Sequence, residues 1–329
     1  MTIRRVKFIV TAFAVSVFSV TALTGTAISA DIIIGAGRSA DVHYYAGRAI
    51  CREVSRAVQG ISCETQKIDG SDAAEPVAVL GNLANAALEI GIVQSDWQHH
   101  AYKSTGPFKF MDVKFDNLRA LFSLHSEPFT LIVRRDAGID GLDDLKGKRV
   151  NMGSPGSPER QMIGMVMKAK GWTRKSFAYV EDLSGAEQAL ALCHDRVQAI
   201  VSTAAHPNAT VARALDLCDA KIVEVGGAEV DKLVGANNFL VATRIPGGLY
   251  AGMDKPMKTF GITVVALSSS DMQDSLIYTV VKSVFDRMDR FKRSHPALEA
   301  LSPQRMMRDG LTAPLHPGAL RYFREKGMM

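Results

Sequence analysis

Short apolar runs alternate along the chain with longer stretches whose apolar residues recur every three or four positions. The short runs predict strands at 31–34, 62–68, 90–94, 149–152, 177–180, 199–202 and 221–225, with extended segments at 118–124 and 129–134. The longer stretches predict helices at 43–58, 75–88, 158–170, 184–194 and 207–217. Strands that alternate with helices favour an α/β fold in which helices cover a sheet.

The pattern breaks at 246–258, which is rich in Gly and Pro, before a predicted strand at 260–267. A last long helix is predicted to begin at Ser270, with Gln273 completing a capping box. Its apolar residues form one stripe: Leu276, Val280, Val281, Val284, Phe285 and Met288. We interpret this stripe as core packing rather than a cofactor contact.

The first 30 residues have the pattern of a secretory signal peptide. Arg4, Arg5 and Lys7 precede an uncharged apolar run, and small residues follow before Ala27 and Ala30, the two acceptable cleavage points. A retained membrane anchor is the alternative, but the run is short for a span and lacks a basic flank after it. We therefore expect export to the periplasm.

The net charge argues against a nucleic-acid partner. The formal charge of the whole chain is +5, but residues 1–30 hold three basic and no acidic residues. Without them the chain has 36 Lys and Arg against 34 Asp and Glu, too balanced for a nucleic-acid surface. About 300 residues are long for one core, so two lobes are expected.

The four cysteines fit an exported protein. Three pairings are possible, and we favour the two local ones, Cys51 with Cys63 and Cys193 with Cys218. Four buried free thiols are the alternative. No C-x-x-C pair or neighbouring histidine supplies zinc-ligand spacing, so no metal is expected.

Small polar residues gather just past the predicted strands. Gly37 and Ser39 follow the first strand, Gln94 and Ser95 the third, and Ser154, Gly156 and Ser157 the strand that ends at Met152; Thr203 ends a later strand. Ligands of open α/β sheets bind at the carboxyl ends of strands. These clusters come from both halves of the chain, which predicts a ligand site between two lobes.

The segment GSPGSPER suits an anion. Ser157 is a plausible N-cap and Pro158 a plausible first helical residue, which leaves backbone N–H groups facing a ligand. Arg160 opposes the helix dipole in the first turn, so it either meets a ligand charge or is an ordinary solvated side chain. His206, in AHPNAT, either contacts ligand or packs on Pro207.

The sequence supports an enzyme active site or a metal site less well than a ligand-binding site. Gly35 to Ala40 read G-x-G-x-x-A, but the first suitable acidic residue, Asp69, lies 32 positions past Gly37, too far for a dinucleotide fold. No hydrolase elbow or H-E-x-x-H motif is present. His99 and His100 are adjacent on a predicted helix and point about 100° apart, so we expect a solvated face rather than a metal site.

Several motifs resemble a known family: GIVQSDWQHHAY, LFSLHSEPFTLIVRRDAGI, LKGKRVNMGSPGS, AEQALALC, HPN and DGLTAPLHPGA. They are similar to the extracytoplasmic solute-binding proteins of TRAP transporters, in the TAXI subfamily. The resemblance implies a two-lobed, type II-like periplasmic-binding-protein fold without catalysis or cofactor. It also implies a monomer that passes a small carboxylate or amino acid to a TRAP-type permease, typically driven by a sodium gradient.

The family pattern is matched unevenly. Near the start, Gly35, Gly37 and Tyr44 match, whereas Arg38, Asp41, His43 and Tyr45 replace usual residues. The second-lobe motif is closer to the family. The resemblance and the strand ends together predict these ligand-binding residues: Gly37, Ser39, Tyr44, Gln94, Ser95, Ser154, Gly156, Ser157, Arg160, Thr203, His206 and Asn208. An altered first lobe predicts a changed ligand.

Chain order predicts lobe one from 31–130 plus 260–329 and lobe two from 131–259, with a crossover nearer 245 as the alternative. Three functions remain open: a receptor for a TRAP permease, a receptor for a sensor or an ABC permease, and an exported Rossmann-type oxidoreductase.

Overall fold

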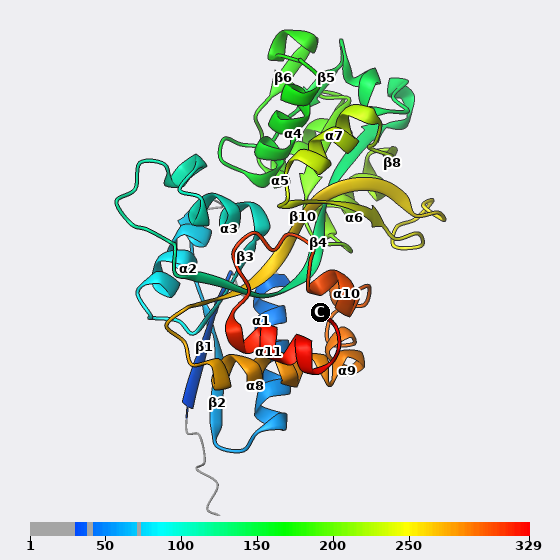
Figure 1. Ribbon diagram of the computed structural model, residues 1–329. Helices are drawn as coiled ribbons and strands as arrows, with labels where there is room; N and C mark the ends of the chain where they lie inside the picture. Colours follow the sequence, from blue (N-terminus) through cyan, green and yellow to red (C-terminus); the bar gives the residue numbers. More distant parts are fainter. Residues whose placement is uncertain (1–29, 38–41, 71–73) are drawn as a thin grey trace, which may run out of the picture.

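The computed structural model describes residues 30–37, 42–70 and 74–329 (Figure 1). The expected signal peptide and Ser39 lie outside these residues, apart from the backbone of Ala30. The predicted α/β fold class is confirmed: helices pack on a mixed sheet that runs through two lobes. Within the described part of the chain, no helix combines the length and apolar character that a bilayer span requires.

Lobe one, at the bottom of Figure 1, combines the two ends of the chain. Its N-terminal elements are β1 Ala30–Ala36, α1 Val42–Ala57, β2 Ile61–Lys67, α2 Ala74–Ala84, β3 Ile90–Gln94 and α3 Ser95–Tyr102. Its C-terminal elements are α8 Asp274–Phe285, α9 Met288–Lys292, α10 Pro303–Met306 and α11 Pro317–Glu325. β1 pairs in parallel with both β2 and β3.

Lobe two, at the top, is built from the middle of the chain. It contains β5 Arg149–Asn151, α4 Pro158–Ala169, β6 Tyr179–Glu181, α5 Gly185–Cys193, β7 Ala199–Thr203, α6 Ala209–Leu217, β8 Ala220–Val223, α7 Ala228–Ala236 and β9 Leu240–Ile245. Short 3-10 turns lie in lobe two at Arg135–Ala137, Leu142–Leu145 and Arg174–Ser176, and in lobe one at Gly106–Phe108 and Pro296–Leu298. β5 pairs in parallel with β6 and β7.

Two long antiparallel strands connect the lobes. β4 Leu118–Arg134 pairs with β10 Met257–Ser269 from Leu118 to Pro128, and its second half pairs with β7 and β8 in lobe two. The prediction of two separate extended segments was wrong, because β4 is one strand of 17 residues. Gly261 permits the close crossing: a Cβ there would lie 2.3 Å from the carbonyl oxygen of Glu127.

Two other details differ from the sequence prediction. The last long helix begins at Asp274, with Gln273 as its N-cap residue, rather than at Ser270. Ser269 and Asp271 instead form a local turn in which the Ser269 hydroxyl accepts from the Asp271 amide at 3.1 Å. The segments that form α7 and β9 were not predicted; α7 has Val230 as its buried residue, so its periodicity is weak.

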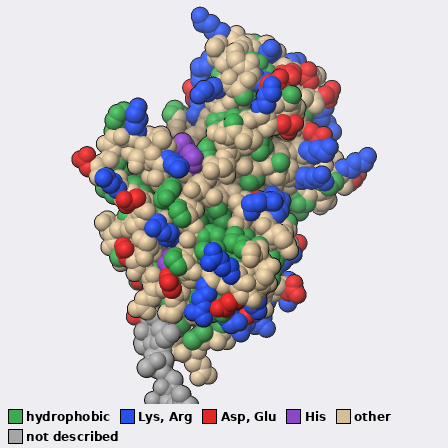
Figure 2. Space-filling view, in the orientation of Figure 1, with side chains coloured by type: hydrophobic (Ala, Val, Ile, Leu, Met, Phe, Trp, Pro, Cys, Tyr) green, Lys and Arg blue, Asp and Glu red, His purple; other side chains and the backbone are tan. Residues whose placement is uncertain are grey.

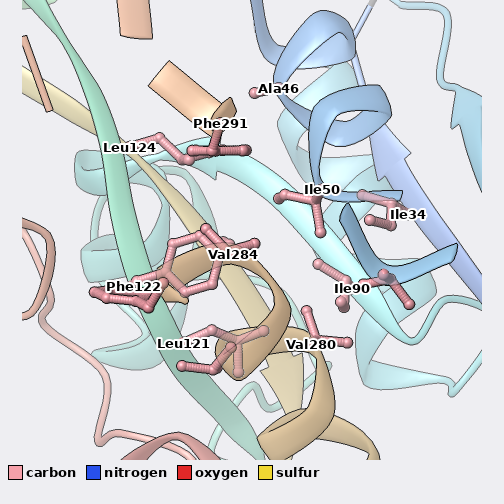
Figure 3. Close-up of a cluster of buried hydrophobic side chains, with 14 of the residues drawn as sticks. Ile34, Ala46, Ile50, Ile90, Leu121, Phe122, Leu124, Val280, Val284 and Phe291 are labelled. Carbon is pink, nitrogen blue, oxygen red and sulfur yellow. The ribbon is translucent and has the colours of Figure 1, made fainter. Parts of the chain in front are cut away.

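Buried apolar residues separate into clusters that do not cross the junction. The lobe-one clusters include Leu124 and Val264, whereas the lobe-two clusters begin at Phe129 and include Ile262. Figure 3 shows part of the lobe-one core, where α1, β1, β3, β4, α8 and α9 contribute Ile50, Ile34, Ile90, Phe122, Val280 and Phe291 among others. The chain therefore folds as two cores joined by β4 and β10.

Each lobe contains one disulfide. Cys51 on α1 is bonded to Cys63 on β2, and Cys193 at the end of α5 is bonded to Cys218 after α6. These are the two local pairings favoured from the sequence. Each bond ties a helix to a neighbouring element within its own lobe, so neither restrains the movement of one lobe against the other.

Candidate functional site at the junction of the lobes

The parallel strands of both lobes direct their carboxyl ends toward the crossing of β4 and β10. In lobe one, Gln94 at the end of β3 pairs with Val264 of β10. In lobe two, Thr203 at the end of β7 pairs with Phe129 of β4. We call this region the junction: the crossing strands together with the loops that follow β1, β3, β5 and β7.

The loop after β5 forms the helix start that the sequence predicted. The Ser157 hydroxyl accepts a hydrogen bond from the Arg160 amide at 3.2 Å, and Pro158 occupies the first turn of α4. Gly153 has a φ of +80°, and a Cβ there would meet the Ser157 hydroxyl at 2.8 Å. The tight turn therefore needs glycine. Ser154 is half-buried and Gly156 exposed in the same loop.

Arg160 is held within lobe two. Its guanidinium donates to the Gly153 carbonyl from Nε at 3.2 Å and from a terminal nitrogen at 2.9 Å. It also forms an ion pair with Asp182. Hydrogen bonds from Arg174 and Arg160 hold the pKa of Asp182 below its usual range. In this structure the Arg160 charge is thus met by the protein.

His206 is buried in a hydrogen-bond network of lobe two. Its Nε2 lies 2.9 Å from the Thr130 hydroxyl, and its Nδ1 lies 2.5 Å from the Tyr250 hydroxyl. That tyrosine oxygen also accepts from the Asn208 amide at 2.8 Å. Burial lowers the pKa of His206 to about 4 and raises the pKa of Tyr250 to about 12.

The remaining lobe-two residues have mixed roles. The Asn208 side chain caps α6 by accepting from the amides of Thr210 and Val211. The Thr203 amide donates to Glu159 at 3.4 Å, which brings the ends of β7 and α4 together. The Thr203 hydroxyl is buried and lacks a hydrogen-bond partner among the described residues.

Ser95 bridges the two lobes. Its hydroxyl donates to the Phe239 carbonyl of lobe two at 2.8 Å and accepts from the Thr263 amide of β10 at 3.2 Å. The Phe239 ring lies 4.9 Å from the His99 ring and 5.8 Å from the His100 ring, centroid to centroid. The expected solvated histidine face was therefore wrong, since both histidines are half-buried beneath lobe two and burial lowers the pKa of each.

Gly37 and Tyr44 lie at the lobe-one side of the junction. A Cβ at Gly37 would lie 3.0 Å from the carboxylate oxygens of Glu75, so the turn after β1 passes close to an acidic side chain. Tyr44 is half-buried on the first turn of α1. Figure 2 shows acidic and basic side chains interspersed over this view of the molecule, and histidine side chains over α3.

A cluster of ionisable residues that the sequence did not mark as a site lies beside Gln94. His43 Nε2 is 3.0 Å from Glu127 Oε1, and Gln94 Nε2 donates to Glu127 Oε2 at 3.4 Å. The ring of His125 lies 5.8 Å from that of His43. His125 and Glu127 are two residues apart on β4, so they project from the same face of the strand.

Two groups in this region carry strongly shifted pKa values. Burial, reinforced by the nearby Glu127 carboxylate, raises the pKa of Asp96 to about 7. Burial lowers the pKa of His125 well below its usual value, with the neighbouring His43 and His295 acting in the same direction. His125 and Glu127 are the two ionisable residues between Arg119 and Arg134 on β4, and this pair is the sequence signal that could have identified the cluster.

A family model described as the NMT1-like family matches residues 34–327. The chain belongs to the NMT1-like family. Its match extends over both lobes and both crossing strands, so the family assignment covers the whole junction.

Three solved structures are similar in fold. A TctC solute binding protein from Polaromonas has a TM-score of 0.57 and 15% identity, over 92% of this chain and 100% of that chain. A putative periplasmic sulfonate-binding protein, SsuA, from Methylobacillus flagellatus has a TM-score of 0.54 and 14% identity, over 91% and 95%. MatC from Rhodopseudomonas palustris, with bound malate, has a TM-score of 0.52 and 14% identity, over 91% and 96%. This NMT1-like protein thus has the two-lobed fold of periplasmic binding proteins.

Proposed function

We propose that this chain is an extracytoplasmic solute receptor that holds a small carboxylate or amino-acid-like molecule at the junction and delivers it to a TRAP-type membrane permease. The observation that carries the proposal is the convergence of strand ends from two separate cores on one junction. Two cores joined by two strands can close on a ligand by a hinge.

The N-terminus of α4 is the proposed anion contact. The capped first turn presents backbone N–H groups and the positive end of the helix dipole, which favour a carboxylate. Ser154, Gly156 and Ser157 would line this side, and Gly37, Tyr44, Gln94 and Thr203 the others. Arg160, His206, Asn208 and Ser95 would support these walls, since each already has protein partners.

The similar structures support a small organic solute. One of them holds malate, a dicarboxylate, and another is described as sulfonate-binding. The latter belongs to an ABC system, so an ABC permease or a sensor is the alternative partner. An oxidoreductase is disfavoured because the first suitable acidic residue after the glycine turn, Asp69, lies 32 positions past Gly37, too far for a dinucleotide-binding fold.

A thermal-shift screen tests the proposal. Dicarboxylates, amino acids and sulfonates should include a ligand that, at a hundredfold excess over Kd, adds about 2.7 kcal/mol of stability. For a chain of this size this corresponds to roughly 4 °C in Tm. NAD, NADP and FAD should give no shift.

Two matched variants locate the binding. Ser154→Trp should abolish the shift by filling the loop after β5, whereas Ser270→Trp, at an exposed position remote from the junction, should leave it intact. A shift by a dinucleotide would overturn the receptor assignment. A carboxylate shift that survives Ser154→Trp would overturn the location.

A further inference from the structure

Three side chains with metal-ligating atoms lie buried together at the lobe-one side of the junction. They are His43 at the start of α1 and His125 and Glu127 on β4, with exposures of 6%, 3% and 7%. One potential ligand atom from each lies within 4.8 Å of the other two. Charged or ionisable residues are rarely buried unless they are paired or bind a metal.

His125 is the residue that ordinary hydrogen bonding does not explain. Both of its ring nitrogens are buried, and neither has a hydrogen-bond partner among the described residues. Leaving a buried polar atom unsatisfied costs about 1–3 kcal/mol. A neutral imidazole nitrogen with a free lone pair is also the most common metal ligand in proteins.

Glu127 is oriented as a metal-binding carboxylate would be. Gln94 donates to Oε2 at 3.4 Å, while Oε1 faces His43 Nε2 at 3.0 Å. Hydrogen bonds of this kind to ligating groups fix their orientation in metal sites. The strand places the side chains of Glu127 and His125 on one face, next to the helix that carries His43.

We infer that His43, His125 and Glu127 form a binding site for one divalent transition-metal cation of the zinc type. Two imidazole nitrogens and one carboxylate oxygen suit Zn²⁺, whereas Ca²⁺ and Mg²⁺ prefer sites made of oxygen atoms. Bonds of about 2.1 Å separate tetrahedral ligand atoms by about 3.4 Å. The His43 and Glu127 atoms, now 3.0 Å apart, would therefore move slightly apart, while ligand atoms separated by up to 4.8 Å would move closer.

A simple ion pair does not account for the cluster. Protonated His43 beside ionised Glu127 would satisfy those two residues at 3.0 Å. It would still leave both nitrogens of His125 without a partner. A cation bound by all three residues gives His125 a ligand bond and neutralises the buried carboxylate.

Three protein ligands leave a fourth coordination position open. The cluster adjoins Gln94 at the end of β3, so a solute carboxylate would fill that position; this step rests on the proposed function. Sequence spacing alone did not predict the site, because Glu127 lies 84 positions from His43.

Metal titration tests the inference without any organic solute. The purified protein, without a histidine tag and stripped with EDTA, is titrated with Zn²⁺ by calorimetry and with Co²⁺ by visible absorption. We expect one ion per chain and the intense d–d bands of four- or five-coordinate Co²⁺. His125→Gln and Glu127→Gln should each weaken binding more than about 100-fold.

His100→Gln is the matched control, since His100 is a half-buried histidine outside the cluster. It should change affinity by less than about twofold. Absence of stoichiometric binding, or equal binding by wild type and folded His125→Gln, would overturn the site; circular-dichroism melting of the metal-free variants verifies folding. If Zn²⁺ binds but does not change solute affinity, only the fourth-ligand step is overturned.

Discussion

The two lobes present chemically different surfaces to their junction. In lobe two most of the polar groups at the junction have partners: Ser157 caps α4, Arg160 pairs with Asp182, and His206 bonds to two hydroxyls. The Thr203 hydroxyl is the exception among the lobe-two groups described above. In lobe one, His125 and Asp96 each keep buried polar atoms without hydrogen-bond partners.

Polar groups that have hydrogen-bond partners serve structural roles, whereas buried polar groups without partners are available for other contacts. A network whose members are all satisfied contributes stability, whereas a buried group without a partner lowers it. Residues of the second kind persist where function needs them, at a cost to stability. The lobe-one surface is therefore the place to look for chemistry specific to this chain. The lobe-two surface is held mainly by hydrogen bonds and ion pairs within its own lobe.

The largest expected effect concerns Asp96 and pH. Its pKa of about 7 in the folded protein lies above the 3.8 of an unperturbed carboxyl. The unfolded chain therefore releases this proton first, and stability falls as pH rises from about 4 to 7, by up to about 4 kcal/mol. Asp96→Asn should remove this loss.

Urea unfolding of EDTA-treated wild type and Asp96→Asn at several pH values measures the effect as a difference between the two proteins. Other titrating groups cancel in that difference. Parallel pH profiles would show that Asp96 is ionised in the folded protein and would remove it from the contrast between the lobes.

The second effect has the opposite sign and belongs to lobe two. The pKa of His206 is about 4 in the folded protein, against 6.5 for a free histidine. Stability is thus lost as pH falls from about 6.5 to 4, by about 3 kcal/mol, because the unfolded chain binds the proton first. His206→Gln should flatten the profile over this acidic range, as measured by the same unfolding series. An unchanged acidic slope would contradict a neutral, buried His206.

The smallest effect compares two histidines directly. His125→Leu removes two unsatisfied nitrogens and should raise the stability of the metal-free protein by about 1 kcal/mol. His206→Leu removes a partner from Thr130 and Tyr250 and should lower stability instead. Thermal melts with EDTA at pH 8 distinguish the two signs. If both variants lose stability equally, the lobes do not differ in the way described.

Much of the fold could be predicted from local patterns. Strong periodicity marked α1, α4 and α8, and the disulfide pairs followed from their positions on neighbouring elements. β4 was divided because His125 to Pro128 interrupt its apolar run. Those residues occupy the crossing between cores, where a strand has no reason to remain apolar. α7 was not predicted because it buries so little of its surface.

The site was less predictable for a physical reason. Ligands of open α/β sheets bind at the carboxyl ends of strands, and this rule identified the loops around Gln94, Ser157 and Thr203. The rule needs only the order of strands and loops along the chain. It could not reveal that Arg160 meets Asp182, or that His43 meets Glu127. Such contacts depend on how distant elements pack, and one sequence does not contain that information in its spacing.

The hydrogen bond between the Ser95 hydroxyl and the Phe239 carbonyl affects the rate at which the lobes separate, rather than the affinity for a ligand. Ser95 belongs to lobe one and Phe239 to lobe two, so separation of the lobes must break this hydrogen bond and expose the ring to water beside His99. Because these contacts must break before the lobes separate, they raise the free-energy barrier to opening. Under the proposed receptor function, the rate of opening would then set how long a bound molecule remains at the junction.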